Sequence, residues 1–309
     1  MIEFSGQAVV VTGAGRGLGR LYALELARRG AAVVVNDLGG TMSGGGADAQ
    51  VADAVVAEIE RNGGRAVASY DSVASVEGGQ AIVDAALTTF GRLDAVVSNA
   101  GIFHTAPFDE IEPEAWRRML QVHLDGGFHL CQPAFRAMKA REGGRFVIVA
   151  SSAGLFGQPN SAHYAAAKAG LLGLANVIAI EGADHGILAN TVLPFGYSRM
   201  VSETIGAPAE PPSDGFLAAI APEHVVPVVV YLASRACELT HHNVSAAAGR
   251  YAAVFVGLAD GWFGERGRLA TAEDIADHVA EIVAAESFSV PMSIFDEVTA
   301  ICERVGIDG

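Results

Sequence analysis

The sequence predicts a doubly wound α/β fold, in which helices cover both faces of a parallel sheet. Three observations predict it: short apolar runs recur along the chain, helix-length segments separate them, and 51% of the 309 residues are hydrophobic. Apolar strands that alternate with helices favour a parallel sheet with right-handed crossovers, because both faces of such a sheet are buried. We expect a catalytic domain over residues 1–256 and a C-terminal extension, residues 257–309, packed on it.

Each predicted strand is a short β-branched run bounded by Gly or Asp, and helices fill the intervals. Strands are predicted at residues 8–11, 31–36, 65–70, 95–98, 146–150 and 188–193. Helices are predicted at residues 18–29, 48–62, 76–90, 113–139, 161–183 and 222–234, the last with proline in its first turn. Pro, Gly and acidic residues over about 197–220 predict a flap. A Thr-Ala-Glu-Asp capping sequence predicts a further helix over residues 271–285.

Composition and charge exclude several partners. The formal net charge of −15 repels nucleic acids and anionic lipids. The longest apolar run, residues 169–180, is shorter than the roughly 18 to 20 residues that a bilayer requires, and residues 1–10 lack a signal-peptide pattern. We therefore expect a cytoplasmic protein with no nucleic-acid or membrane partner.

The cysteines and histidines give no sign of a metal site. Three widely spaced cysteines predict reduced thiols. The adjacent His241 and His242 lack an acidic third ligand, so no metal site is expected.

A glycine-rich turn follows the first predicted strand. It reads Thr12-Gly13-Ala14-Gly15-Arg16-Gly17-Leu18-Gly19, and the first helix begins inside it. A chain that turns tightly, brings its amides to a pyrophosphate and then begins a helix needs residues without Cβ at those points. The pattern predicts a Rossmann-type dinucleotide site formed by Gly13, Arg16, Gly17, Leu18 and Gly19.

The ends of the next strands supply further candidate cofactor residues. Asp37 stands 18 residues after Gly19, where a carboxylate accepts hydrogen bonds from an adenosine ribose and repels a 2′-phosphate. We therefore expect NAD as the cofactor; the alternative is that Asp37 only opens the following glycine-rich loop as a turn residue. Ligands bind at the carboxyl ends of parallel strands. That edge also holds Asp71, Ser72, Asn99, Ala100 and Gly101.

Three residues form a candidate catalytic group. Tyr164 and Lys168 lie four residues apart on one helical face, and Ser151 precedes Tyr164 by thirteen residues. A phenol has a reference pKa of about 10, but a neighbouring lysine and an oxidised nicotinamide both favour the phenolate. A serine can hold the substrate oxygen while the phenolate takes its proton. Ser152 is the rival serine.

These motifs, in this order and spacing, resemble the short-chain dehydrogenase/reductase family over residues 4–234. The resemblance implies that Tyr164 is the general acid/base and that Ser151 orients the substrate. It also implies that Lys168 binds the nicotinamide ribose and lowers the pKa of Tyr164, and that Tyr164 and Pro194 contact the cofactor. The wider family has an asparagine where His123 stands; we interpret this histidine as a subgroup feature.

A closer resemblance is to one subgroup, the (3R)-hydroxyacyl-CoA dehydrogenase domains of peroxisomal multifunctional enzymes of type 2 and their free-standing bacterial relatives. The segments that carry it are residues 35–40, 70–73, 122–126, 170–176, 198–200 and 261–264. It implies NAD-dependent oxidation of a (3R)-hydroxyacyl-CoA with a fatty or steroid-derived acyl group. Phe103, Phe195 and Tyr197 are expected to contact that substrate.

Two other functions remain open. One is a dehydrogenase of free hydroxysteroids or other lipophilic alcohols, and the other is a non-catalytic dinucleotide-binding sensor. The intact Ser151, Tyr164 and Lys168 argue against the sensor, which has no chemical need for all three. Family members are commonly dimers or tetramers through the long fourth and fifth helices, so we expect a homodimer or homotetramer.

Overall fold

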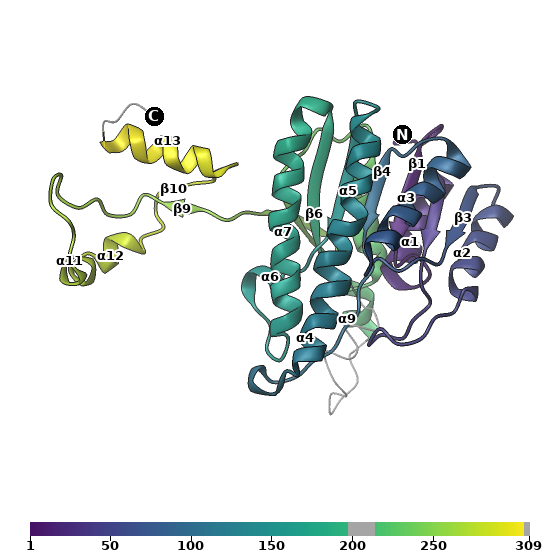
Figure 1. Cartoon of the computed structure of the whole chain (residues 1–309), viewed down its shortest axis with the longest axis horizontal. Coiled ribbons are helices and arrows are strands. Elements are labelled where there is room, and N and C mark those ends of the chain that lie inside the picture. Colours follow the sequence, from purple (N-terminus) through teal and green to yellow (C-terminus); the bar gives the residue numbers. More distant parts are fainter. Residues whose placement is uncertain (197–213, 306–309) are drawn as a thin grey trace. The chain divides into compact units, whose positions relative to one another are not determined.

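The computed structural model describes residues 1–196 and 214–305 and divides the chain into two compact units, Met1–Ala253 and Val254–Gly309. In the first unit the described strands form an eight-stranded sheet in the order β3-β2-β1-β4-β5-β6-β7-β8 (Figure 1). The strands are β1 (Ala8–Thr12), β2 (Ala32–Asn36), β3 (Arg65–Ser69), β4 (Ala95–Ser98), β5 (Gly144–Val149), β6 (Ile187–Phe195), β7 (Asn243–Ala247) and β8 (Arg250–Val254). Strands β1 to β7 pair in parallel, which confirms the predicted fold class.

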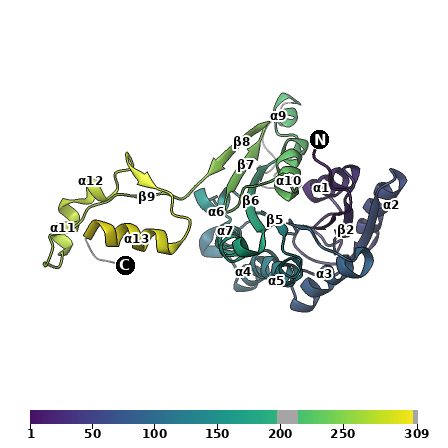
Figure 2. The ribbon, with the colours of Figure 1, turned by 90° about the horizontal axis from the view of Figure 1, so that it is seen from above.

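Helices cover both faces of this sheet, as Figure 2 shows. The helices on one face are α1 (Gly17–Arg28), α2 (Gln50–Arg61) and α10 (Val226–Ala233); those on the other are α3 (Val76–Phe90), α5 (Gly126–Lys139) and α7 (Ala162–Gly182). Val9 and Val11 of β1 join the first core, whereas Val10 joins the second. Successive side chains of a strand point to opposite faces, so one continuous apolar run serves both cores.

Two predicted helices differ in detail. The segment 113–139 comprises α4 (Pro113–Leu120), a π-helical stretch η2 (Gln121–Asp125) and α5. The segment 222–234 begins as a 3₁₀ turn, η4 (Pro222–Val225), and continues as α10. Short helices not predicted from the sequence are η1 (Phe108–Glu110), α6 (Ala153–Phe156) and η3 (Ala183–His185). Of the predicted flap, residues 197–213 lie outside the described residues, and α9 (Asp214–Ala219) follows them.

Strands β7 and β8 were also absent from the prediction. Their residues are largely half-buried or exposed, and they include small and polar side chains rather than a continuous β-branched run. A strand at the side of a sheet lacks the uninterrupted apolar pattern of a central parallel strand. The pattern used to find strands therefore could not detect this pair.

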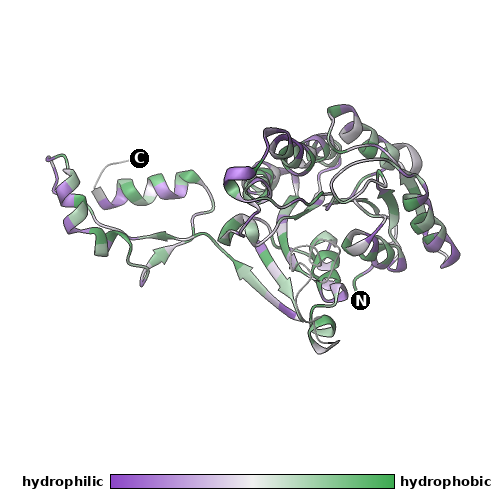
Figure 3. Ribbon diagram, turned by 90° about the horizontal axis from the view of Figure 1, so that it is seen from below, coloured by the Kyte–Doolittle hydropathy of each residue, from purple (hydrophilic) through white to green (hydrophobic). Residues whose placement is uncertain are grey.

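The second unit is small. It contains the antiparallel pair β9 (Leu258–Ala259) and β10 (Phe288–Ser289), and the helices α11 (Ala272–Asp277), α12 (Val279–Ile282) and α13 (Ile294–Val305). The predicted capping sequence is present as a capping box, in which the Thr271 hydroxyl accepts from the Asp274 amide at 3.2 Å. The expected single helix is instead two short ones that meet at His278. Apolar and polar residues alternate along α13 (Figure 3), which the sequence had not marked as a helix.

Two helical stretches, Ala162–His185 and Gly215–Ala233, are long and apolar enough to cross a membrane by length and composition alone. Both stretches include polar residues, and for that reason they are longer than the longest uninterrupted apolar run, residues 169–180. The first contains α7, whose Leu171 and Ile178 are buried in the second core. Core helices of folded proteins satisfy the same criterion.

Candidate active site

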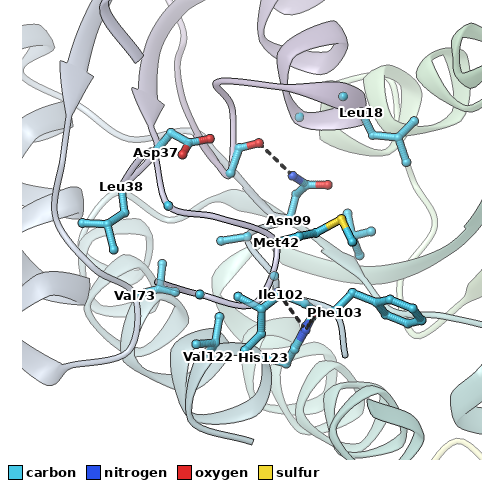
Figure 4. Close-up of a pocket in the computed structure, with 18 of the residues that line it drawn as sticks. Leu18, Asp37, Leu38, Met42, Val73, Asn99, Ile102, Phe103, Val122 and His123 are labelled. Carbon is cyan, nitrogen blue, oxygen red and sulfur yellow. Dashed lines mark hydrogen bonds between the residues drawn. The ribbon is translucent and has the colours of Figure 1, made fainter. Parts of the chain in front are cut away.

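A cavity of about 700 Å³ lies at the carboxyl ends of the central strands (Figure 4). The fourteen residues predicted to bind the cofactor all line it, as do Ser151, Phe103 and Phe195. Ser152 does not line it, which favours Ser151 between the two candidate serines. Tyr197 lies outside the described residues. The fold thus brings residues from the ends of six strands, β1 to β6, and from several helices to one cavity.

The glycine-rich turn is held rigidly against β4. Gly13 has φ +62°, and a Cβ on Gly19 would lie 2.1 Å from the Gly13 carbonyl oxygen, so neither position accepts a side chain without rearrangement. The Thr12 hydroxyl accepts hydrogen bonds from the amides of Asn99 and Ala100, both at 3.0 Å. Asn99 Nδ2 in turn donates to the Thr12 carbonyl at 2.9 Å. These bonds join the ends of β1 and β4 beneath the turn.

The structure is compatible with both roles that the sequence left open for Asp37, because its carboxylate forms a turn and also lines the cavity. One carboxylate oxygen accepts from the Gly39 amide at 2.7 Å, which is the bond of a turn-forming aspartate. The other accepts from the Gly15 amide at 2.8 Å, so the carboxylate is fixed beside the glycine-rich turn and lines the cavity. Arg16 donates to the Gly40 carbonyl at 3.3 Å, which places a guanidinium near this loop as well.

These residues fit a nicotinamide dinucleotide. Amides of the turn at the start of α1 can receive a pyrophosphate, and the Asp37 carboxylate retains lone pairs for ribose hydroxyls. Leu38 and Val122 supply apolar walls on either side of the same end of the cavity (Figure 4). Among the described residues, no group of three or more His, Cys, Asp or Glu is placed to hold a metal ion.

Ser151, Tyr164 and Lys168 meet at the other end of the cavity. Lys168 Nζ donates to the Val149 carbonyl at 2.7 Å and lies 5.6 Å from the centroid of the Tyr164 ring. Burial lowers the pKa of Lys168 from 10.5 to about 7. Burial raises the pKa of Tyr164, and a hydrogen bond with the Ser151 side chain acts in the opposite direction. In the protein alone the pKa of Tyr164 is therefore raised, and the lowering that the family resemblance implies requires a further positive charge.

Two aromatic rings flank Tyr164 edge-on. The Phe103 ring centroid lies 5.3 Å from that of Tyr164 at 83°, and the His123 ring lies at 5.3 Å and 90°. His123 is buried, with Nε2 2.7 Å from the Ile102 carbonyl oxygen. Burial lowers the pKa of His123 to about 3, so the ring is neutral near pH 7.

Other residues that line the cavity escaped the sequence analysis. They are Leu38, Met42, Arg118, Gln121, Val122 and Gln158, among others, whereas His123, which also lines the cavity, had been noted as a subgroup feature. Met42 belongs to the glycine-rich loop that follows Asp37, and its carbonyl accepts from the Phe103 amide at 2.9 Å. This contact joins the Asp37 end of the cavity to the Tyr164 end. Only the run of glycines over residues 39–46 signalled that this loop was unusual.

Comparison with known proteins agrees with this arrangement. Residues 7–206 match the short chain dehydrogenase family. The chain is 47% identical over 231 residues to a short-chain type dehydrogenase/reductase of Mycobacterium tuberculosis, covering 75% of this chain and 78% of that protein. It is 46% identical over 237 residues to peroxisomal multifunctional enzyme type 2 of Mus musculus, covering 77% of this chain and 31% of the mouse enzyme. The chain thus matches less than a third of the mouse enzyme's length.

Solved structures show the same likeness. Full-length peroxisomal multifunctional enzyme type 2 from Drosophila melanogaster superposes with a TM-score of 0.82 at 30% identity, over 99% of this chain and 50% of that one. Carveol dehydrogenase from Mycobacterium avium, solved in complex with NAD, has a TM-score of 0.72 at 25% identity, over 79% and 97% of the two chains. Since the family match spans more than half of the chain and its motifs meet in one cavity, the chain belongs to the short-chain dehydrogenase/reductase family, whose members are oxidoreductases that bind nicotinamide dinucleotides and act on CH–OH groups.

Proposed function

We propose that this chain is an NAD-dependent dehydrogenase that oxidises a (3R)-hydroxyacyl-CoA to the 3-ketoacyl-CoA. The observation that carries the proposal is the extent of the likeness to the Drosophila multifunctional enzyme, which covers 99% of the chain. The likeness to carveol dehydrogenase covers 79%. A likeness limited to cofactor binding would not need to extend through the C-terminal unit. The 3-hydroxyacyl thioester is the substrate that the sequence resemblance implies.

The proposed chemistry follows from the residues around Tyr164. The Ser151 hydroxyl holds the C3 oxygen of the substrate, and the Tyr164 phenolate removes its proton. When bound, NAD would supply the acceptor for the hydride that leaves C3. Lys168, close to Tyr164, binds the nicotinamide ribose. The Phe103 and Phe195 rings, which line the same cavity, contact the acyl group.

NAD is the proposed cofactor because Asp37 would repel a 2′-phosphate. Both carboxylate oxygens are already fixed by backbone amides, so the carboxylate cannot swing away from a phosphate without losing two hydrogen bonds. Arg16 acts in the opposite direction, because a guanidinium attracts a 2′-phosphate and this one donates to the Gly40 carbonyl near the same loop. We propose that the carboxylate, which two amides hold, outweighs the exposed arginine.

The test is a substrate panel assayed with purified full-length protein. NAD and NADP reduction would be followed by the absorbance of the reduced cofactor, with (3R)- and (3S)-hydroxyacyl-CoA thioesters of several chain lengths, free hydroxysteroids and simple lipophilic alcohols as substrates. We expect the highest kcat/KM for a (3R)-thioester with NAD. High activity on a free hydroxysteroid or alcohol with none on any (3R)-thioester would replace the proposal with the lipophilic-alcohol alternative. Absence of all turnover would favour the sensor.

A further inference from the structure

The glycine-rich loop between β2 and α2 is folded into a closed shape. Its two ends lie side by side, because the Asp48 amide donates to the Leu38 carbonyl at 2.9 Å. Inside it, the Thr41 amide donates to the Gly45 carbonyl at 2.8 Å, and the Thr41 hydroxyl accepts from the Gly45 amide at 3.0 Å. A loop whose ends meet and which bonds to itself is an Ω-loop, and such loops are frequently functional. We call residues 38–48 the strap.

The strap reaches from β2 to the segment that follows β4. It leaves the sheet after β2, and its Met42 carbonyl accepts from the Phe103 amide at 2.9 Å. A Cβ on Gly44 would lie 3.1 Å from Ile102 Cγ2, so the strap also packs against the residue next to Phe103. Strand β1 lies between β2 and β4 in the sheet. A segment that joins the ends of β2 and β4 therefore spans the end of β1.

The end of β1 is also where the dinucleotide site lies. The glycine-rich turn begins there, and the cavity is lined both by that turn and by Thr41, Met42 and Gly44 of the strap (Figure 4). Arg16, which belongs to the turn, donates to the Gly40 carbonyl at 3.3 Å. The strap and the turn thus enclose the same space from two sides. A cofactor held by the turn would lie beneath the strap.

Few contacts hold the strap in this position. Among the residues that the structure describes, two hydrogen bonds join its middle, residues 40–46, to other segments, and their donors are Arg16 and Phe103. Met42 is the one large apolar side chain of this middle part, and it is only half-buried. Segments with few buried apolar contacts open far more readily than a packed core. The strap can therefore leave the cavity without unfolding the sheet.

We propose that the strap is a gate for the cofactor, which opens at the Met42–Phe103 bond to admit the dinucleotide and closes again once it is bound. The inference goes beyond the proposed function, because it concerns cofactor exchange and holds for any alcohol substrate. Closure also fixes the backbone of Phe103, whose ring centroid lies 5.3 Å from that of Tyr164. Opening of the strap therefore loosens the catalytic end of the cavity as well.

A disulfide across the contact between the strap and Ile102 tests the gate. A Cβ at position 44 would lie 3.1 Å from Ile102 Cγ2, which is one bond from Ile102 Cβ, so cysteines at positions 44 and 102 are within reach of a disulfide. The variant combines Gly44→Cys and Ile102→Cys with Cys302→Ser, because Cys302 is the natural cysteine that is not buried. Mass spectrometry of the oxidised protein would verify the crosslink.

NADH dissociation is the quantity to measure, or NADPH dissociation if that cofactor binds more tightly. Loaded protein would be mixed with an excess of the oxidised cofactor, and the fluorescence of the bound reduced cofactor followed by stopped flow. We expect crosslinking to slow dissociation by about tenfold or more, because the lid can no longer open, and dithiothreitol to restore the rate of the reduced variant. Crosslinked protein that releases NADH as fast as its reduced form would overturn the inference.

A pair of alanine substitutions tests the same contact without a crosslink. Gly44 and Gly46 have φ values of +86° and +74°, so alanine strains the backbone at either position. At position 44 the added methyl group also meets Ile102, whereas at position 46 no atom of another described segment lies within 4 Å. We therefore expect NADH to dissociate about three- to tenfold faster from Gly44→Ala than from Gly46→Ala. Equal rates in the two variants would refute the gate.

These measurements need no alcohol substrate, so they separate this inference from the proposed function. Thermal unfolding of each variant would identify loss of fold. If NADH binds but leaves at the same rate with the strap crosslinked or free, the gate is wrong and the thioester proposal stands. If the wild-type protein binds neither NADH nor NADPH, both the gate and the proposed dehydrogenase activity fail.

Discussion

Burial sets the protonation of the side chains at the catalytic end of the cavity. It lowers the pKa of Lys168 to about 7 and raises that of Tyr164. Both shifts have the same cause, since a low-dielectric surrounding disfavours whichever form is charged. A cationic ligand placed beside both groups would favour the phenolate and the neutral lysine. We therefore expect the acid/base behaviour of this site to depend on the cofactor.

Tyr164→Phe tests the acid/base role directly. Removing the hydroxyl should lower kcat by about 10² to 10⁴, the usual contribution of a positioned acid or base, while NAD affinity measured by fluorescence titration changes little. Tyr70→Phe is a matched control, because Tyr70 is exposed and its hydroxyl bonds to Asp53 away from the cavity. Substantial turnover by the Tyr164 variant would refute the assignment.

Asp37→Ala tests the choice of cofactor. Loss of the carboxylate removes the ribose acceptor and the repulsion of a 2′-phosphate, and it leaves the Arg16 guanidinium nearby. The ratio of kcat/KM for NAD over NADP should fall, with NAD weakened more than NADP. Asp84→Ala, which changes an exposed aspartate on α3, should leave the ratio unchanged. A wild-type preference for NADP would contradict the interpretation of Asp37.

Lys168→Met tests the pKa of the buried lysine through stability. Between pH 7 and 10.5 the lysine is protonated in the unfolded chain but largely deprotonated in the folded chain. Because the unfolded chain then binds more protons, the free energy of unfolding increases as the pH rises through this range. Lys168→Met should flatten this rise in urea titrations at pH 7, 8 and 9. The exposed Lys139→Met serves as the control. An unchanged slope in the Lys168 variant would show that the lysine keeps an ordinary pKa.

Among the elements, the ends of β1 and β4 are the most tightly joined part of the cavity. Thr12 is fully buried, and its hydroxyl accepts from two backbone amides of the segment after β4. Two glycine-containing turns start from these strand ends. The Thr12 hydroxyl, together with the Asn99 side chain, therefore holds the glycine-rich turn in place.

Thr12→Val should break that connection without changing the volume of the side chain. It leaves two amides without their acceptor, at a cost of about 1–3 kcal/mol for each buried group. We expect the free energy of unfolding from urea titration to fall by a comparable amount and the affinity for NAD to weaken. Thr89→Val, on the exposed surface of α3, is the control. Wild-type stability in the Thr12 variant would mean that these amides find other partners.

At the scale of the whole molecule, the exposed apolar side chains of α5 and α7 suggest association. Phe128, Val177 and Ile180 are 46%, 51% and 49% exposed, although they belong to the two long helices of one face. Large exposed apolar surfaces mark interaction sites, and these side chains make the outer surface of the two helices partly apolar. We propose that a second copy of the chain covers them, which gives a homodimer or a homotetramer.

Val177→Asp should weaken this association, because an interface would bury an unpaired charge. Light scattering coupled to size-exclusion chromatography should show a shift toward monomer, with the cofactor affinity of the remaining protein preserved. Val76→Asp, at an exposed valine that begins α3, is the control. A wild-type protein that is monomeric at all accessible concentrations would contradict the proposal.

Local sequence patterns predicted the central sheet and much of the cavity. Val9, Val10 and Val11 form a strand buried on both faces, Gly13 to Gly19 mark a turn, and Tyr164 and Lys168 share a helical face because they are four residues apart. Each of these features depends on residues close together in the chain. Strand β7, which lies between β6 and the edge strand β8, was missed because its half-buried residues have no such local pattern.

Local patterns in the sequence predicted the succession of the central strands and helices along the chain and the residues at their ends, since periodicity, glycine conformations and i,i+4 spacing are local properties. The tertiary structure alone decided that Met42 bonds to Phe103, that His123 lies against Gly101 and Tyr164, and that burial shifts the pKa of Lys168. These contacts join residues far apart in the chain. A methionine, a histidine or a lysine carries no local signal of which distant surface it will meet, because packing and desolvation arise only when the whole chain has folded.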